Sequence, residues 1–324
     1  MKNRQRFHET MGYGAPDRVP YFEEGIREEV LEVWRTQGLP ANADISKMFP
    51  ADRQIEIALD LDPRPELQKW PSTVCDLAVF RKHLDADDPG RRPDNWAELV
   101  RTSARDESVV MLRVHRGFFL TMGVRAWKRF HELMSLLIED PELVRQAMEI
   151  QGRFAARLVE RTLSEIKVDA AVFSEPIGGN GGPLIAPRMY EDFVLKSYEP
   201  VLAALRRGGV EIIIFRTYAN ARLLIPSILK WGFNCLWACE VNLEAMDYAD
   251  LRREFGRDLR LIGGIDLDAL RRGPAAIRRE IERTVPQLIA DGGYVPLADG
   301  RIREDVPFEN YRYYRRLLEN VIQG

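Results

Sequence analysis

The chain has 324 residues, of which 45% are hydrophobic and 30% charged, and its 47 Lys and Arg residues nearly balance 50 Asp and Glu residues. The net charge of -3 argues against a protein that binds nucleic acid through a general basic surface, and the hydrophobic content excludes a disordered chain. No apolar run approaches the roughly 20 residues of a membrane helix, and the three cysteines are too few for a disulfide framework, so a cytoplasmic location is expected.

Short apolar runs alternate with longer amphipathic segments along nearly the whole chain, which is typical of alternating strands and helices. Eight strands are predicted, at Arg18–Glu23, within Ile55–Phe80, and at Val109–Val114, Ala170–Ser174, Glu211–Phe215, Cys235–Cys239, Leu259–Gly263 and Gly293–Leu297. Eight strands with intervening helices favour an α/β fold in which residues 1–324 form one (β/α)8 TIM barrel domain.

The helices between these strands carry their own boundary signals. Asp140 before Pro141 combines a capping side chain with a proline at the first helical position. Pro187 opens a helix that ends at a glycine pair, and Pro200 should kink it. Two later helices are predicted at Leu267–Ala290 and Phe308–Ile322.

Residues 45–94 fit the alternation worst because they contain six prolines and many aspartates. This composition predicts an irregular insertion after the first βα unit, which would lie over one end of the barrel.

Polar residues follow seven of the predicted strands. In a barrel of this kind the active site lies at the carboxyl ends of the strands, so these residues are expected to converge on one mouth. They are Glu23, Glu24, His115, Arg116, Ser174, Glu175, Arg216, Thr217, Tyr218, Asn220, Glu240, Asn242, Asp266, Asp299 and Arg301.

Several of these residues also have a structural interpretation. Asn220 and Asp266 stand where helices begin and would serve as N-caps. Glu175 ends an apolar run, and a buried carboxylate is costly unless it is paired, which indicates either a site role or an ion pair with Arg216 on the next strand.

The glycine-rich segment 178–183, which contains Asn180, predicts a mobile active-site loop whose amides could hold an anion. It lacks the lysine of a phosphate-binding loop and the dinucleotide-binding glycine pattern. Cys235 and Cys239 would be about 13 Å apart on a strand, too far to share one zinc ion, so no metal site is predicted.

Five segments together resemble the uroporphyrinogen decarboxylase superfamily, collinearly over almost the full length. They are Ala15–Pro20, Gly182–Tyr190, Leu261–Asp266, Gly292–Pro296 and Asp305–Tyr311. The resemblance implies the (β/α)8 barrel and a homodimer, and it offers two chemistries: decarboxylation of a porphyrinogen without a cofactor, or methyl transfer between a corrinoid protein and an acceptor such as tetrahydrofolate.

The family motifs depart from both chemistries in this chain. Where the decarboxylases carry an Arg-Gln-Ala-Gly-Arg-Tyr segment, this chain has Glu23 to Glu28, in which only Arg27 corresponds. Where the zinc methyltransferases carry a His-x-Cys pair, it has Arg216 and Tyr218, which excludes zinc-thiolate chemistry through those ligands.

Three hypotheses follow from the resemblance. The leading one is an enzyme that transfers a one-carbon unit without zinc, with a corrinoid or tetrahydrofolate as co-substrate, no tightly bound cofactor, and a corrinoid protein as partner. The second is a decarboxylase or other lyase acting on a smaller organic acid, and the third is a non-catalytic small-ligand-binding barrel. The predicted catalytic residues are Glu175, Arg216, Tyr218 and Glu240, and the predicted substrate-binding residues are Glu24, Arg27, His115, Arg116, Asn180, Asn220, Asp266 and Asp299.

Overall fold

A computed structural model describes residues 1–105, 107–239 and 243–324. The chain forms two compact units that interleave along the sequence. Unit 1 comprises Met1–Gln54, Glu107–Val109 and Cys235–Gly324, and unit 2 comprises Ile55–Asp106 and Val110–Asn234.

Unit 2 is built on strands in the order β1-β2-β3-β6, of which β2, β3 and β6 are parallel. These strands span Gln54–Ala58 (β1), Val109–His115 (β2), Ala170–Glu175 (β3) and Ile212–Tyr218 (β6), and a short hairpin pairs Gly178–Gly179 (β4) with Gly182–Pro183 (β5). The three parallel strands are nearly continuous apolar runs, as expected for strands that are covered by helices.

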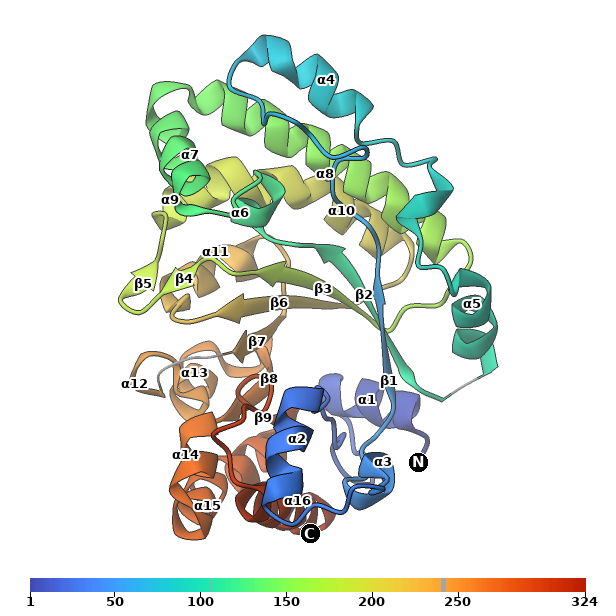
Figure 1. Ribbon diagram of the computed structural model, residues 1–324, viewed down its shortest axis with the longest axis vertical. Coiled ribbons are helices and arrows are strands. Elements are labelled where there is room, and N and C mark those ends of the chain that lie inside the picture. Colours follow the sequence, from blue (N-terminus) through green and yellow to red (C-terminus); the bar gives the residue numbers. More distant parts are fainter. Residues whose placement is uncertain (106, 240–242) are drawn as a thin grey trace. The chain divides into compact units, whose positions relative to one another are not determined.

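Helices of unit 2 cover one face of these strands (Figure 1), where α8 and α10 run above β3 and β6. Phe173 of β3 contacts Tyr198 of α10, which places the core between the sheet and that helix. The helical segments are Val74–Asp76 (η1), Leu77–Lys82 (α4), Pro89–Arg91 (η2), Trp96–Arg105 (α5), Phe118–Thr121 (α6), Trp127–Glu139 (α7), Pro141–Leu163 (α8), Pro187–Tyr190 (α9), Glu191–Leu195 (η3), Lys196–Arg207 (α10), Arg222–Leu224 (η4) and Ile225–Lys230 (α11).

Unit 1 contains the parallel strands β7 (Cys235–Cys239), β8 (Arg260–Ile265) and β9 (Tyr294–Ala298). Its long helices α15 and α16 pack against each other, and α15 also contacts β9. The helical segments are Asn3–Met11 (α1), Glu28–Thr36 (α2), Ile45–Met48 (α3), Leu243–Met246 (α12), Tyr248–Phe255 (α13), Gly256–Asp258 (η5), Leu267–Arg272 (α14), Pro274–Asp291 (α15) and Phe308–Gln323 (α16).

Seven of the eight strands that the sequence predicts are present in the structure. The prediction of a strand at Arg18–Glu23 is wrong. The described segment 18–23 forms no strand. Pro20 has no N–H to donate to a ladder, and the Tyr21 N–H donates instead to the Asp52 carboxylate at 2.9 Å. Because a side chain satisfies this backbone donor, no strand partner is required.

The helix signals are confirmed with two refinements. Asp140 caps α8 by accepting from the Leu143 N–H at 3.2 Å. The helix predicted from Pro187 contains a π-helical turn, η3, and Pro200 lies farther along, inside α10. The segment predicted at Leu267–Ala290 is two helices because Gly273, with a φ of 100°, separates them.

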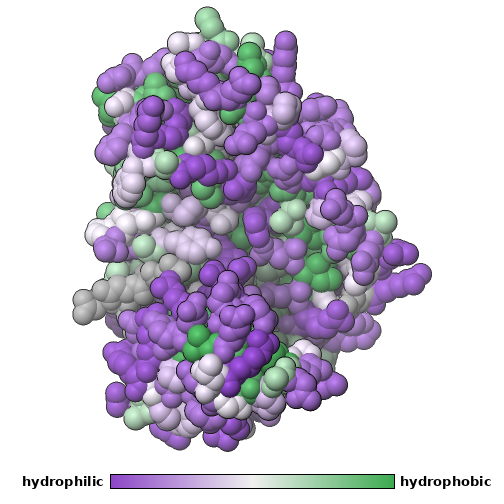
Figure 2. Space-filling model, in the orientation of Figure 1, coloured by the Kyte–Doolittle hydropathy of each residue, from purple (hydrophilic) through white to green (hydrophobic). Residues whose placement is uncertain are grey.

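The segment predicted as an insertion supplies strand β1, together with α3, η1, α4 and η2, so it is not only loops. Hydrophilic side chains cover most of the visible surface of each unit (Figure 2). Among the described residues no helix is long and apolar enough to cross a membrane.

Candidate functional site

Glu175, the last residue of β3, lies in a fully buried hydrogen-bond network of unit 2. Its Oε1 accepts from the Phe118 N–H at 2.8 Å, and its Oε2 accepts from the Tyr198 hydroxyl at 2.7 Å and the Tyr190 hydroxyl at 3.2 Å. Three donors therefore satisfy a carboxyl group that has no access to water.

His115, the last residue of β2, belongs to the same network. Its Nδ1 accepts from the Gly117 N–H at 2.9 Å and lies 2.9 Å from the Tyr198 hydroxyl oxygen. With Nδ1 as an acceptor, the ring proton of the neutral imidazole is assigned to Nε2. The Tyr198 hydroxyl thus lies within hydrogen-bond distance of both His115 and Glu175, and its single proton is donated to one of the two groups at a time.

Burial shifts both titratable groups toward their neutral forms. Desolvation raises the pKa of Glu175 to about 7, against the three hydrogen bonds, which lower it. Desolvation and, to a smaller extent, the Arg116 guanidinium lower the pKa of His115 to about 3. Glu175 therefore gains or loses its proton close to neutral pH, whereas His115 stays uncharged.

Arg216 lies on the opposite face of the same strands. Ser174 of β3 pairs with Arg216 of β6, and Glu175 pairs with Thr217. Because successive side chains of a strand point to opposite faces, Arg216 and Glu175 point away from each other. The expectation that these two converge on one mouth is wrong, and so is the alternative of an ion pair between them.

On its own face, Arg216 approaches Glu56 of β1, with Nη1 3.5 Å from Oε2. Arg113 of β2 donates from Nε to Oε1 of the same carboxylate at 2.9 Å. Tyr218 lies two residues beyond Arg216 and therefore shares its face. Two guanidinium groups thus share one carboxylate on the strand face that the helices of unit 2 leave uncovered.

A cavity of about 450 Å³ lies in the segment after β1. Its lining includes Asp62, Trp70 and Arg125. The Asp62 carboxylate accepts from Arg125 at 3.2 Å and also binds Arg116, which follows β2. This cavity has the size of a small-molecule site and lies beside residues that follow two of the strands.

The predicted glycine loop is an ordered hairpin in the structure. Gly179 bridges to Asn220, whose N–H donates to the Gly179 carbonyl at 3.1 Å. A Cβ on Gly178 would lie 2.3 Å from the Tyr218 carbonyl oxygen, so this backbone approach needs glycine. The hairpin therefore holds Asn180 near the chain that follows β6, while Asn220 uses its Oδ1 to accept from the Arg222 N–H at 3.1 Å.

The predicted site residues of unit 1 have separate surroundings. Asp266 caps α14, accepting from the Asp268 N–H at 2.8 Å and pairing with Arg272. Asp299 is buried directly after β9, and Arg27 and Glu24 precede α2, with Arg27 exposed and Glu24 half-buried. Glu240 and Asn242 lie outside the described residues.

Sequence reasoning missed Glu56, Arg113 and Asp62. Arg113 is the single charge in the apolar run of β2, and Glu56 alternates with two isoleucines in β1, so each signals a strand face that is not covered by apolar packing. The sequence therefore marks both residues as unusual, but their contact depends on the order of the strands in the sheet, which local sequence does not reveal.

No group of three His, Cys, Asp or Glu side chains that could hold a metal ion occurs among the described residues. Cys235 and Cys239 are buried in β7, and burial raises the pKa of the Cys235 thiol to about 12. These two cysteines lie among packed residues, as the sequence predicts.

Comparisons with known proteins agree on one family. A family model described as uroporphyrinogen decarboxylase (URO-D) matches residues 99–319. The uroporphyrinogen decarboxylase of Neisseria meningitidis serogroup C is 24% identical over 237 residues, which cover 71% of this chain and 57% of the relative. The enzyme of that name from Pseudoalteromonas atlantica is 22% identical over 262 residues, covering 77% of this chain and 69% of the relative. The match thus spans little more than half the length of the Neisseria relative.

Proposed function

This chain belongs to the uroporphyrinogen decarboxylase (URO-D) family, and on that premise we propose that it is a carboxy-lyase acting on a small organic acid. The names of its relatives support the reaction class, and the charged strand face of unit 2 supports the kind of substrate. The proposal includes the closed (β/α)8 barrel that is expected for the family.

The observation that carries the proposal is the arrangement of Arg113, Glu56 and Arg216. Two guanidinium groups meet one carboxylate on a strand face. A guanidinium can bind a carboxylate through two parallel hydrogen bonds, so a face that carries two of these groups is suited to recognise a substrate carboxylate.

In the proposed reaction the bond between the substrate carbon and its carboxylate breaks, and carbon dioxide leaves. The electron pair stays on the carbon, which then takes a proton, so atoms and charge balance without an oxidant. Arg216 and Arg113 hold the acid, and the Tyr218 hydroxyl on the same face supplies the proton. Glu175 is not assigned to this step because it is buried on the other face.

The substrate is proposed to be smaller than a porphyrinogen. Glu23 and Glu24 stand where the decarboxylases carry an arginine-containing motif. Glu23 is held by Arg315 at 3.1 Å and by the Tyr311 hydroxyl, so its carboxylate is part of the fold of unit 1. A substrate with many carboxylates would gain no attraction at these two positions.

The test is carbon dioxide release from a panel of small mono- and dicarboxylic acids. Arg216→Gln is expected to lower kcat/KM by about 100-fold, since it removes a charge-assisted contact to the reacting group. Arg279→Gln, an equal charge change at an exposed residue of α15, is expected to leave the rate unchanged. Release that persists in Arg216→Gln would contradict the assigned site.

Methyl transfer remains a second candidate because Arg216 occupies the position of a family zinc ligand. A fixed guanidinium there suits the carboxylates of a folate. Incubation with methylcobalamin and tetrahydrofolate tests this candidate: a change in the corrinoid spectrum, with no carbon dioxide from any acid, would favour methyl transfer. Acid binding without either reaction would favour a non-catalytic binding protein.

A further inference from the structure

Helix α7 of unit 2 carries a row of exposed side chains that is mostly apolar. Trp127 in its first turn is 77% exposed and Ile138 in its last turn is 74% exposed, the two highest values among the large apolar side chains that the structure describes. His131, which is exposed, and Met134, which is half-buried, lie between them. Spacings of four, three and four positions place these four residues on one side of the helix. We name this row the α7 stripe.

The other side of α7 is anchored in unit 2. Leu133 and Leu137 are buried, and Figure 1 shows α7 beside α8, which it contacts, at the margin of the unit. Phe130 packs on Phe119 of α6 with ring centroids 5.3 Å apart, and the Trp127 ring lies 5.6 Å from that of Phe130. The α7 stripe is therefore an exposed apolar surface on a helix that is fixed by its buried side, which is typical of a protein contact site.

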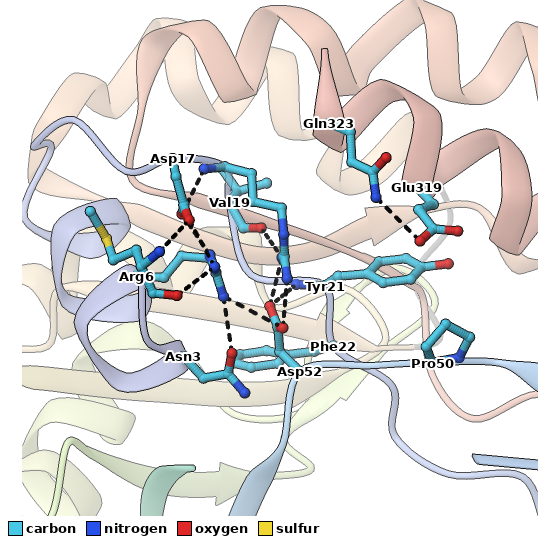
Figure 3. Close-up of polar contacts among 12 residues, drawn as sticks. Asn3, Arg6, Asp17, Val19, Tyr21, Phe22, Pro50, Asp52, Glu319 and Gln323 are labelled. Atoms are coloured by element: carbon cyan, nitrogen blue, oxygen red, sulfur yellow. Dashed lines mark hydrogen bonds and ion pairs between the residues drawn. The ribbon is translucent and has the colours of Figure 1, made fainter. Parts of the chain in front are cut away.

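Two charges of opposite sign flank the α7 stripe. Lys128 and Glu139 are about three helical turns apart and therefore lie on the same flank. The side chain of neither makes an ion pair or hydrogen bond in the described part of the chain. Many other charged side chains are paired internally. Figure 3 shows an example in unit 1, where Arg6 donates to Asp17 at 2.8 Å and lies 3.6 Å from Asp52.

The α7 stripe and its flanking charges are complementary to a second copy of themselves. If two α7 helices lie antiparallel about a two-fold axis, Trp127 of each copy faces Ile138 of the other. The same axis places Lys128 of each copy beside Glu139 of the other, as flanking charges pair in antiparallel helices. A parallel arrangement would instead place these charges on opposite flanks of the contact.

We propose that the α7 stripe binds a second copy of this chain through antiparallel packing of the two α7 helices. Homodimer formation is implied by the resemblance to the family, but the surface and the register of the contact are not. The inference does not rest on the proposed reaction, because none of the residues assigned to that reaction lies on α7.

The size of the contact predicts a weak association. Helix α7 has 13 residues and is therefore about 20 Å long. One pair of such helices buries less surface than the roughly 1,600 Å² that is typical of stable complexes. We therefore expect monomer and dimer to exchange, with the dimer fraction rising as the protein concentration rises.

Sedimentation velocity over a wide concentration series tests the apolar part of the contact. Ile138→Ser is expected to raise the dissociation constant of the dimer by at least about tenfold, because the two-fold axis makes each substitution remove two apolar contacts. Leu223→Ser is the matched control, since Leu223 of η4 is a 62% exposed apolar residue of the same unit outside α7. This control should associate as the wild type does.

A charge exchange tests the antiparallel register. Lys128→Glu alone and Glu139→Lys alone should each weaken association by several-fold, because like charges then meet at both ends of the contact. An equimolar mixture of these two variants should restore association, because every lysine then faces a glutamate of the other variant. Its recovery also shows that both variants are folded.

Three results would overturn the proposal. They are a wild type that stays monomeric over the whole series, a dimer that Ile138→Ser leaves intact, and a mixture of the charge variants that associates no better than either variant alone. Loss of the dimer in Leu223→Ser but not in Ile138→Ser would place the contact outside α7.

Discussion

At the residue scale, Glu175 carries opposing contributions. Burial raises the pKa of this carboxyl group to about 7, while hydrogen bonds from Tyr198, Phe118 and Tyr190 lower it. The folded state therefore holds the proton more tightly than the unfolded chain does. A group of this kind contributes stability that is fully present below the unfolded pKa of about 4.5 and is lost as pH rises through about 7.

We expect Glu175→Gln to remove this pH dependence. Each unit of difference between the folded and unfolded pKa corresponds to about 1.4 kcal/mol. Between pH 4.5 and 8 the unfolding free energy of the wild type should therefore fall by up to about 3 kcal/mol relative to that of the variant. Urea unfolding at half-unit pH intervals measures the difference. Glu199→Gln on the exposed side of α10 serves as control, and a wild-type-minus-variant difference that is flat with pH would contradict the assignment.

The stability contribution of His115 depends on pH in the opposite direction. Burial lowers its pKa to about 3, so its contribution is present above the unfolded value of about 6.5 and is lost as pH falls toward 3. The two groups share Tyr198, so one network loses stability from both ends of the pH range.

At the element scale, helices α8 and α10 pack closely at Gly152. A Cβ on Gly152 would lie 2.0 Å from the Ser197 carbonyl oxygen, a backbone atom that cannot move without the helix. Glycine is thus what allows the two helices their close approach.

We expect Gly152→Ala to destabilise the protein by about 2 kcal/mol or more, since overpacking forces the helices apart. Gly181→Ala is the matched control, because a Cβ there meets nothing within 4 Å. Chemical denaturation of both variants measures the effect. Equal stabilities would mean that α8 and α10 separate without cost.

Removing the N-cap of α14 by mutation distinguishes a structural role of Asp266 from a role in substrate binding. Its carboxylate accepts from the Asp268 N–H, and losing an N-cap costs about 1 kcal/mol. Asp266→Ala is therefore expected to lower stability by about that amount with no change in KM, whereas Asp266→Asn keeps the cap. A raised KM at unchanged stability would restore the substrate-binding interpretation.

At the scale of the whole molecule, family membership and metal content are separate questions. Arg216 and Tyr218 stand where the resemblance to the zinc methyltransferases would place a His-x-Cys pair, and neither is a usual zinc ligand. We expect elemental analysis of the purified protein to find no stoichiometric zinc, and dialysis against a chelator to leave its activity unchanged. Activity that chelation abolishes and added zinc restores would refute this expectation.

The family model matches residues 99–319 of the 324-residue chain. The near-neutral balance of 47 basic and 50 acidic residues leaves specific ion pairs, rather than net charge, to define sites. Homodimer formation and a corrinoid protein partner stay predictions, which sedimentation and pull-down experiments with the full chain would test.

The sequence by itself determined seven strands of the two units and the resemblance to the family, although the strand expected at Arg18–Glu23 is absent. β7 is a continuous apolar run and β3 and β6 each begin with one, and such runs identify buried strands from local sequence alone. The start of α8 at Asp140 and Pro141 was also predicted from local sequence, because an N-cap side chain bonds to backbone groups within the first turn of its own helix.

Only the tertiary structure decided which side chains meet. Glu175 and Arg216 differ in strand face by one position of register, and a pattern of period two cannot show which face helices will cover. Glu56 meets Arg113 and Arg216 from 57 and 160 residues away in the chain, a contact set by strand order. Likewise, Tyr21 gives its N–H to Asp52 rather than to a strand, because a distant carboxylate satisfies that donor within unit 1.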